Sequence, residues 1–259
     1  MSQFAPDTTT RTALVTGASR GLGAAIAEAM GREGASLLLV ARPEADLRDP
    51  VAPRKILTQA RRLWPRIDIV VNNAAIAGPM GMLADNDWDR WRETIQVNLL
   101  APAEITKLAI EWMRETGGGG SIINISGGGA ASARPGFSAY ATAKCGLARF
   151  TETVAAEVAP LGIRVNSIAP GAMNTAMLDQ IRRAMPESLA GTATADPRIA
   201  ADLAVYLASD EAAGITGKLI SAVWDEWREL HQHSEELKRS DVYTLRRILP
   251  ADRGKAADV

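Results

Sequence analysis

The chain has 259 residues, and 47% of them are hydrophobic, so it is long enough to bury one large core in one domain. Its formal net charge of −1 gives no indication of a nucleic acid or an anionic membrane as partner. No hydrophobic run approaches the ~18 residues of a membrane span, and residues 2–11 lack a signal-like hydrophobic core, so we expect a cytoplasmic protein. The one cysteine, Cys145, excludes an internal disulfide framework, and we expect it to be a small packed residue.

Short hydrophobic runs alternate with helical patterns along most of the chain. The runs predict strands at residues 13–15, 36–40, 67–71, 121–125, 163–168 and 219–223. The patterns between them predict helices at residues 24–30, 52–64, 88–114, 140–159 and 196–208. Buried runs separated by helices are typical of parallel strands. The expected fold is therefore α/β, a doubly wound, Rossmann-like parallel sheet with helices on both faces.

The segment between the second and third predicted strands is short. Only 24 residues, 43–66, separate the second predicted strand from the third. A single helical crossover takes at least about 10–12 residues, and the predicted helix at 52–64 uses most of the segment. We therefore predict that the edge strand of a complete doubly wound half, and the helix before it, are missing or vestigial.

A glycine-rich segment, residues 16–23 (TGASRGLG), lies between the first predicted strand and the helix that follows it. A strand, a glycine turn and a helix are the context that a dinucleotide-binding motif requires. Glycines permit a tight turn and a close approach of the backbone to a pyrophosphate, which then lies at a helix N-terminus with free N–H groups. The segment therefore predicts a dinucleotide cofactor.

Tyr140 and Lys144 stand four residues apart in a predicted helix, so their side chains share one face. An unperturbed tyrosine has a pKa of about 10, and acid–base work near pH 7 needs a pKa lower by roughly 3, which corresponds to ~4 kcal/mol. A nearby cation favours the phenolate and can supply much of that difference. Taken alone, the pair also fits an exposed lysine one turn after a tyrosine, so its meaning depends on the rest of the chain.

Six short motifs follow one another along the sequence. They are residues 16–23, 72–75 (NNAA), Asn98, 124–126 (NIS), the pair Tyr140-x-x-x-Lys144, and 170–175 (PGAMNT). In this order they resemble the short-chain dehydrogenase/reductase family, over residues 12 to about 223. The resemblance implies one domain at residues 1–223, an NAD(P)(H) cofactor, and hydride exchange between a ketone and a secondary alcohol. It also implies a homotetramer or homodimer and a mobile substrate lid at about residues 173–195.

The resemblance also implies roles for single residues. Tyr140 would be the general acid in ketone reduction, or the base in alcohol oxidation. Lys144 would lower the pKa of Tyr140 and bind the nicotinamide ribose. Asn98 would hold a proton-relay water near the lysine, unless it only satisfies its own helix backbone. The residues implied to bind the cofactor are Gly17, Ser19, Arg20, Gly21, Leu22, Gly23, Arg42, Asp46, Asn73, Ala74, Tyr140, Lys144, Pro170, Gly171 and Thr175.

This chain departs from the family's pattern at the catalytic serine. The family normally carries a carbonyl-binding serine 13 residues before the tyrosine, and this chain has Gly127 there. Adjacent side chains on a strand point to opposite faces, so Ser126 is not a simple replacement. Three consecutive glycines, residues 127–129, permit a twist or bulge that would bring Ser126 inward, and we favour Ser126 for the role. Otherwise the role falls to Ser138, or Tyr140 works alone.

The charges after the second predicted strand favour NADP(H) over NAD(H). NAD-specific members place an acidic residue at the end of that strand to hold the ribose hydroxyls, and here the position is Ala41. Arg42 follows it, and Arg20 in the glycine turn is a second cation at the same end of the site. Two guanidiniums suit a 2′-phosphate, and the alternative is two ordinary surface arginines. Asp46 resembles the family's acidic contact to adenine.

Residues 224–259 extend beyond the last predicted strand. Trp224, Trp227 and Leu230 recur at helical spacing, which predicts an amphipathic helix packed on the body or on a partner subunit. His231 and His233 lack companions with metal-ligand spacing, so no metal site is predicted.

Two other functions stay open at this point. Gly127 and the shortened edge are compatible with a catalytically weak, cofactor-binding sensor or structural subunit. The scaffold also supports other chemistry, such as the epimerisation or dehydration of a sugar. The retained Tyr140, Lys144 and Asn98 favour the oxidoreductase, whose small-molecule ketone or alcohol substrate no motif identifies.

Overall fold

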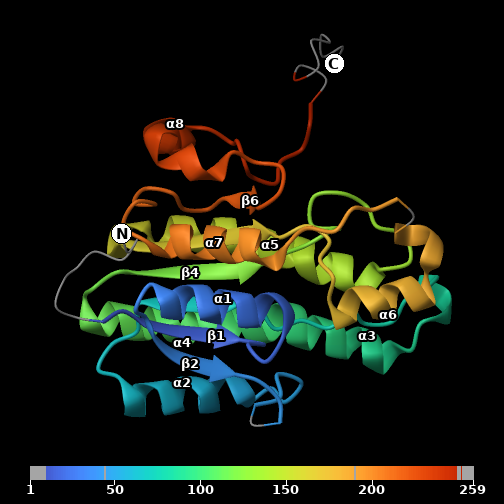
Figure 1. Ribbon diagram of the computed structural model, residues 1–259, viewed down its shortest axis with the longest axis horizontal. Helices are drawn as coiled ribbons and strands as arrows, with labels where there is room; N and C mark the ends of the chain where they lie inside the picture. Colours follow the sequence, from blue (N-terminus) through green and yellow to red (C-terminus); the bar gives the residue numbers. More distant parts are fainter. Residues whose placement is uncertain (1–9, 44, 190, 250–251, 253–259) are drawn as a thin grey trace.

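The computed structural model describes residues 10–43, 45–189, 191–249 and 252. Its centre is a parallel sheet of six strands in the order β2-β1-β3-β4-β5-β6 (Figure 1). The strands are β1 (Thr12–Thr16), β2 (Ser36–Val40), β3 (Ile69–Asn72), β4 (Gly120–Ile125), β5 (Ile163–Ala169) and β6 (Leu219–Ser221). The strand order reverses between β1 and β3, as in a doubly wound sheet. The predicted α/β class is confirmed.

Helices cover both faces of this sheet. On one face lie α1 (Gly21–Arg32) and α7 (Pro197–Ala208). On the other lie α2 (Ala52–Leu63), α4 (Ala101–Thr116) and α5 (Ser138–Val158). No helix among the described residues is long and hydrophobic enough to cross a membrane.

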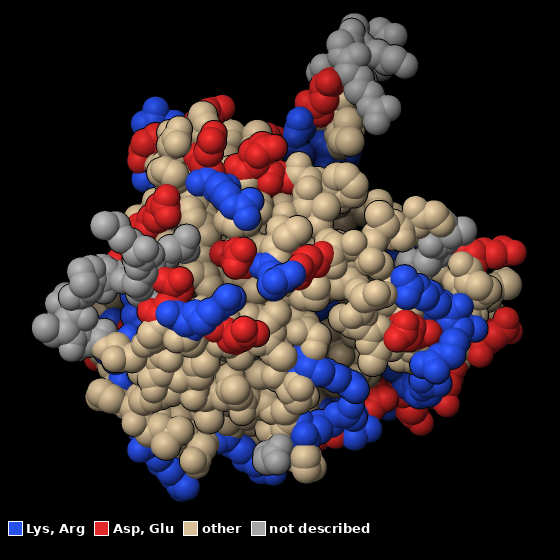
Figure 2. Space-filling model, viewed as in Figure 1, with Lys and Arg blue, Asp and Glu red and all other residues tan. Residues whose placement is uncertain are grey.

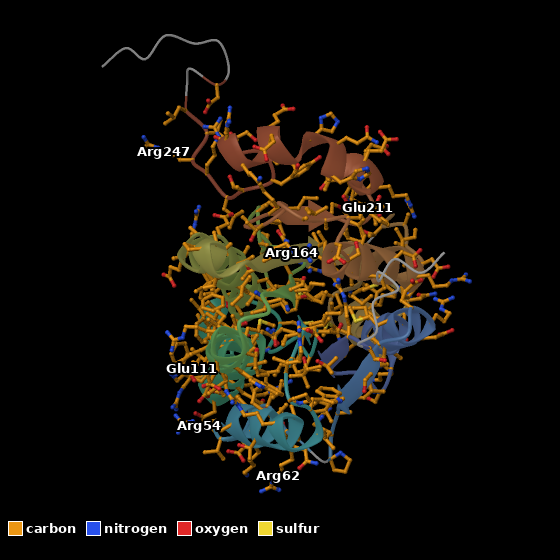
Figure 3. All side chains as sticks on the ribbon, turned by 90° about the vertical axis from the view of Figure 1, so that its left-hand side faces the viewer. Arg54, Arg62, Glu111, Arg164, Glu211 and Arg247 are labelled. Carbon is orange, nitrogen blue, oxygen red and sulfur yellow. The ribbon has the colours of Figure 1, made fainter. Side chains whose placement is uncertain are left out.

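Successive side chains of a strand point to opposite faces of the sheet, and this divides the core into two layers. In β1, Ala13 and Val15 pack with α1 and α7, whereas Leu14 between them packs with the helices of the opposite face. Figure 3 shows the layers from the side, with Glu111 of α4 on the left and Glu211, just after α7, on the right. The two-sided burial explains why the strands read as continuous hydrophobic runs in the sequence.

β2 forms one edge of the sheet, and no described strand lies outside it. The segment from residue 41 to 68, described apart from residue 44, contains α2 and loops but no strand. The prediction that the usual edge strand and its preceding helix are missing is therefore confirmed for the described residues. At this edge Leu39 is 51% exposed.

The predicted helix at residues 88–114 is divided into three parts. α3 (Trp88–Ile95) leads into a π-helical turn, Gln96–Leu100, and α4 begins at Ala101. Pro102, the second residue of α4, follows the π-helical turn directly and has no N–H to donate to it. π-Turns inside helices often mark functional positions, and this one carries Asn98.

The segment after β6 packs on the body of the protein. Trp227 and Leu230 are buried in the core layer that contains α7. They belong to a 3₁₀ turn, Trp227–His233, which is followed by α8 (Ser234–Arg239). Trp224 precedes the turn and is 84% exposed. The prediction of one helix that carries all three residues is therefore wrong, because the helical segment begins only after Trp224. Packing of the extension on a partner subunit stays a prediction.

A buried lysine ties the chain beyond α8 to the sheet. Lys218, just before β6, is 5% exposed, and its Nζ donates to the carbonyl oxygens of Ser240 (3.0 Å) and Val242 (2.9 Å). The N–H of Leu219 donates to the carbonyl oxygen of Tyr243 at 2.7 Å. The chain after α8 therefore lies against β6 (Figure 1).

Candidate active site

A cleft of about 1150 Å³ lies at the carboxyl ends of the strands, where ligands bind in open parallel sheets. In Figure 2 the surface is hollowed at this end of the sheet, and Lys and Arg side chains border the hollow. Asn98 is the one predicted site residue outside the cleft lining. The predicted residues that line it are Gly17, Ser19, Arg20, Gly21, Leu22, Gly23, Arg42, Asp46, Asn73, Ala74, Ser126, Tyr140, Lys144, Pro170, Gly171 and Thr175.

The turn between β1 and α1 is packed too closely for side chains at two of its glycines. Gly17 has φ +68°, and a Cβ atom there would lie 2.9 Å from the Cα of Ala74. A Cβ atom at Gly23 would overlap the carbonyl oxygen of Gly17. Asn73 holds the turn in place, because its Nδ2 donates to the carbonyl oxygens of Thr16 (2.9 Å) and Gly17 (3.2 Å). The motif residue Asn73 thus acts on the cofactor site through the glycine turn.

The N-terminus of α1 opens onto the cleft through Gly21, Leu22 and Gly23. The side chain of Arg20, which precedes the helix, makes no capping hydrogen bond, and the first turn has no acidic residue. Free N–H groups and the positive end of the helix dipole favour an anion at this position. The turn and the helix end therefore fit the pyrophosphate of a dinucleotide.

Two arginines beside the glycine turn have no carboxylate partner among the described residues. Arg20 and Arg42 both line the cleft, and neither forms a salt bridge or a side-chain hydrogen bond with another described residue. The guanidinium of Arg42 lies close enough to Asp46 to contribute to the lowering of that carboxyl's pKa. These two side chains would meet a phosphate placed at the end of β2.

Asp46 already has a partner within the protein. Arg48 Nε donates to its two carboxylate oxygens at 3.0 and 2.8 Å, and hydrogen bonding from Arg48 lowers the pKa of the carboxyl. Arg48 also pairs with Glu93 of α3 at 3.3 Å. Asp46 and Glu93 are the acidic side chains among the described residues of the cleft lining, and the same arginine engages both. The adenine contact expected for Asp46 stays a prediction.

α5 carries Tyr140 and Lys144 one turn apart, and both side chains line the cleft. Lys144 is 2% exposed, and its Nζ donates to the carbonyl oxygen of Ile125, the last residue of β4, at 2.7 Å. This burial lowers the pKa of Lys144 to about 8. Its Nζ lies 5.7 Å from the centre of the Tyr140 ring. The lysine thus joins α5 to the end of β4.

The pKa of Tyr140 moves in the direction opposite to the expected one. Burial raises it, and the cation that opposes the rise is Arg134. Burial of the phenol outweighs any opposing effect of Lys144, whose Nζ is directed to the carbonyl of Ile125, so the pKa of Tyr140 is raised where the sequence predicted a lowered one. A phenol with a raised pKa is protonated at neutral pH, which is the form that a general acid needs before it donates.

Arg134 is a cleft residue that the sequence motifs do not single out. It lies half-buried in the loop between β4 and α5, with its guanidinium carbon 4.2 Å from the centre of the Phe137 ring. Hydrophobic residues do not recur at helix or strand spacing in this loop, so no sequence pattern indicates a role for any of its positions. The available signal is that Arg134 is the only charged residue between Ser126 and Tyr140.

The structure directs Gly127, and not Ser126, toward Tyr140. A Cβ atom added at Gly127 would lie 2.7 Å from the phenolic oxygen of Tyr140. Ser126 is 2% exposed, and its Oγ donates to the carbonyl oxygen of Lys144 at 3.4 Å. This hydrogen bond turns the hydroxyl of Ser126 to the backbone of α5, although the residue also lines the cleft, and does not support the carbonyl-binding role expected for it. Ser138 lies outside the cleft lining, where its Oγ accepts a hydrogen bond from a tryptophan of α3.

Asn98 fixes the loop after β3. Its Oδ1 accepts from the N–H of Ile76 at 2.9 Å, and its Nδ2 donates to the carbonyl oxygen of the same residue at 2.8 Å. Asn98 is fully buried, whereas Ile76 lines the cleft. The side chain therefore satisfies the backbone of a cleft loop and not that of its own helix. The water-holding role expected for Asn98 stays a prediction.

The segment between β5 and α7 packs over Tyr140. It contains α6 (Ala176–Ala184), and Met177 and Met185 form one hydrophobic cluster with Phe137 and Tyr140. Methionine side chains adapt their shape easily, which suits a wall that closes on a substrate. The mobility expected for this segment stays a prediction.

Cys145 follows Lys144 on α5 but is exposed, so the expectation of a packed residue is wrong. Successive residues of a helix are turned by about 100°, which carries Cys145 off the face that holds Lys144. Within the part of the chain that the structure describes, no group of three or more His, Cys, Asp or Glu side chains is arranged to hold a metal ion.

Known proteins resemble this chain over about four-fifths of its length. "Dehydrogenase/reductase SDR family member 4" of Homo sapiens is 32% identical over 237 residues, covering 81% of this chain and 85% of that protein. "Oxidoreductase UcpA" of Escherichia coli K12 is 34% identical over 241 residues, covering 81% of this chain and 91% of that protein.

Solved structures of similar proteins share the fold. A candidate NAD(P)-dependent gluconate 5-dehydrogenase from Beutenbergia cavernae, with NADP bound at low occupancy, has a TM-score of 0.76 at 29% identity and covers 83% of this chain and 96% of its own. A candidate gluconate dehydrogenase from Agrobacterium tumefaciens has a TM-score of 0.75 at 28% identity, covering 83% of this chain and 95% of its own.

Two family models together match the sheet, the glycine turn and α5. The model described as "Enoyl-(Acyl carrier protein) reductase" matches residues 43–222, and the one described as "short chain dehydrogenase" matches residues 11–52. With matches of this extent, the chain belongs to the short-chain dehydrogenase/reductase family and is an NAD(P)-dependent oxidoreductase.

Proposed function

We propose that the enzyme exchanges a hydride between NADP(H) and a ketone or secondary alcohol, with Tyr140 as general acid in reduction and general base in oxidation. The observation that carries this proposal is the position of the Tyr140 hydroxyl, which faces the end of β4 in the cleft that the glycine turn also lines. When bound, the nicotinamide supplies or accepts the hydride. The phenol gives its proton to the substrate oxygen as the carbonyl becomes an alcohol.

Lys144 supports Tyr140 once that proton has left. An ammonium with a pKa of about 8 is mostly charged at pH 7. Its Nζ is 5.7 Å from the phenol ring in a site shielded from water, so its charge acts strongly on the phenolate and only weakly on the neutral phenol. The lysine therefore favours the state of Tyr140 that follows proton transfer.

Tyr140 is the donor to the substrate oxygen in this proposal, without help from a serine. Position 127 is glycine, and the hydroxyl of Ser126 is engaged with the backbone of Lys144. Asn98 contributes by holding the loop at Ile76, which forms part of the cleft wall.

NADP(H) is preferred to NAD(H) because Arg20 and Arg42 lie beside the glycine turn with no described carboxylate to pair with them. Alanine at position 41 leaves no acid to hold the ribose hydroxyls of NAD. The similar protein from Beutenbergia cavernae has NADP bound. A homo-oligomeric assembly and a cytoplasmic location stay predictions.

Tyr140→Phe tests the proposal, because it removes only the hydroxyl. A panel of ketones, sugars and acyl thioesters is first screened for NADPH oxidation to find a responsive substrate. We expect turnover of that substrate to fall by about 10²- to 10⁴-fold, the usual contribution of a positioned acid, while NADPH binding measured by fluorescence titration changes little. Tyr206→Phe is the matched control, because Tyr206 is buried outside the cleft and should be dispensable for turnover. Equal turnover in wild type and Tyr140→Phe contradicts the proposal.

A further inference from the structure

Arg134 lines the cleft together with Tyr140, and the proposed reaction makes no use of it. Its guanidinium carbon lies 4.2 Å from the centre of the Phe137 ring. On another side its Nη1 lies 3.1 Å from the position that a Cβ of Gly128 would occupy. An aromatic ring and a glycine backbone therefore hold the half-buried guanidinium in place.

This guanidinium has no carboxylate partner among the described residues. The acidic side chains of the described cleft lining are Asp46 and Glu93, and both pair with Arg48. From Ser126 to Thr192 the described lining contains no acidic side chain, and its other cation is Lys144. A partly buried cation without a counter-ion is unfavourable, so an anionic ligand group would stabilise it.

We infer that the substrate is an oxo acid or hydroxy acid whose carboxylate is bound by Arg134, an inference that rests on the proposed function of this cleft. The planar guanidinium presents paired N–H groups that match the two oxygens of a carboxylate. Arg134 is near enough to Tyr140 to oppose the rise in the phenol's pKa, which places the bound carboxylate close to the reacting carbonyl. Met177 and Ile181, which also line the cleft, would contact the carbon chain between the two groups.

The inference predicts discrimination between an acid and its uncharged ester. Hydrogen bonds between charged groups make Arg134 worth about 10- to 100-fold in kcat/KM for an acid. A neutral ester leaves the guanidinium unpaired and gains nothing from it. Arg134 is thus a specificity residue, distinct from the acid–base pair.

Two matched pairs of ketones test this: pyruvate with methyl pyruvate, and levulinate with methyl levulinate. We expect wild type to prefer the acid in at least one pair, and Arg134→Gln to lose that preference while turning over the ester as before. Arg134→Lys should keep part of the preference, because it retains the charge without the paired N–H groups. Arg183→Gln is the control, since Arg183 is an exposed cation on α6 outside the cleft lining and should leave the preference unchanged.

Calorimetry separates this inference from the proposed function. The protein saturated with NADP⁺ is titrated with levulinate and with pyruvate, in wild type and in Arg134→Gln. Binding that is lost in Arg134→Gln supports the carboxylate site even if no ketone is turned over. Equal turnover of acid and ester by wild type, or equal effects of Arg134→Gln on both, overturns the inference while leaving the oxidoreductase in place. Failure of wild type to bind either acid also overturns it.

Discussion

The phenolic oxygen of Tyr140 occupies the space that a side chain at Gly127 would need, since a Cβ atom there would come within 2.7 Å of it. Separations below 3.0 Å are essentially never seen for real Cβ atoms. The φ of Gly127 lies outside the left-handed region, so the glycine provides room for the phenol and not a special backbone conformation. The glycine at the family's serine position and the placement of Tyr140 are therefore linked.

Gly127→Ala should displace the Tyr140 hydroxyl and slow the reaction. We expect kcat/KM to fall by roughly 10- to 100-fold, because small misplacements of a reacting group have effects of this size. Gly127→Ser should retain more activity than Gly127→Ala, since its hydroxyl can donate to the substrate oxygen. Steady-state kinetics with one ketone compare the three proteins. Wild-type turnover in Gly127→Ala would show that Tyr140 does not act from this position.

Lys144 should make the stability of the protein depend on pH. Its pKa is about 8 in the folded protein, and an unfolded lysine has a pKa of about 10.4. Between these values the unfolded state binds more protons, so the free energy of unfolding rises with pH from about 8 to about 10, by up to about 3 kcal/mol. The raised pKa of Tyr140 acts only above about pH 10, where stability is lost as pH rises, and so lies outside this window.

Urea unfolding at several pH values between about 7 and 10 measures this rise. In Lys144→Met the rise should be absent, because no buried ammonium remains to lose its proton. Lys107→Met is the control, since Lys107 is an exposed lysine paired with Glu111 on α4 and should leave the rise intact. The same slope in wild type and Lys144→Met would contradict the lowered pKa.

Much of the fold and of the cofactor site follows from local sequence. The carboxyl ends of parallel strands meet at one edge of a sheet, so Gly17 after β1 and Asn73 after β3 can be assigned to one cleft from strand order alone. The missing edge strand follows from length, because the segment before β3 has room for one helical crossover. Both inferences depend on spacing along the chain and not on the direction of any side chain.

The directions of side chains in loops and at strand ends cannot be predicted from spacing along the sequence. Whether Ser126 or Gly127 faces Tyr140 depends on how the chain leaves β4, which three consecutive glycines leave undetermined in the sequence. The hydrogen bonds between Asn98 and Ile76 join segments 22 residues apart, so no local pattern predicts them. Arg134 lies in a loop without helical or strand patterning, and only the structure shows that it lines the cleft.

The choice between the two nicotinamide dinucleotides should depend on the unpaired arginines. We expect Arg42→Gln, and separately Arg20→Gln, to weaken NADPH binding by about tenfold and to leave NADH binding almost unchanged, because a charged hydrogen bond to the 2′-phosphate is lost. Dissociation constants for both cofactors come from fluorescence titration. Arg32→Gln removes the same charge from the far end of α1, outside the cleft lining, and should change neither constant. Equal losses for NADPH and NADH would contradict the assignment of these residues to a 2′-phosphate.

The extension after β6 should contribute to the stability of the protein through Trp227. Trp227 is 4% exposed, its ring centre lies 5.8 Å from that of Tyr206, and its Nε1 donates to the carbonyl oxygen of Ala222 at 3.2 Å. Trp227→Ala should lower the free energy of unfolding by about 3–5 kcal/mol, the usual cost of removing a buried tryptophan side chain.

Trp224→Ala is the matched control, because Trp224 is 84% exposed and its loss should change stability by no more than about 0.5 kcal/mol. Urea unfolding monitored by circular dichroism compares both variants with wild type at one protein concentration. Trp224 lies only three residues before Trp227, and both variants replace a tryptophan by alanine. A difference in stability between them therefore reports the difference in burial of the two side chains. Similar losses in the two variants would mean that Trp224 is buried in solution, most simply against a second subunit, and a protein-concentration series of the unfolding curves would then decide between assembly and a different fold of the extension.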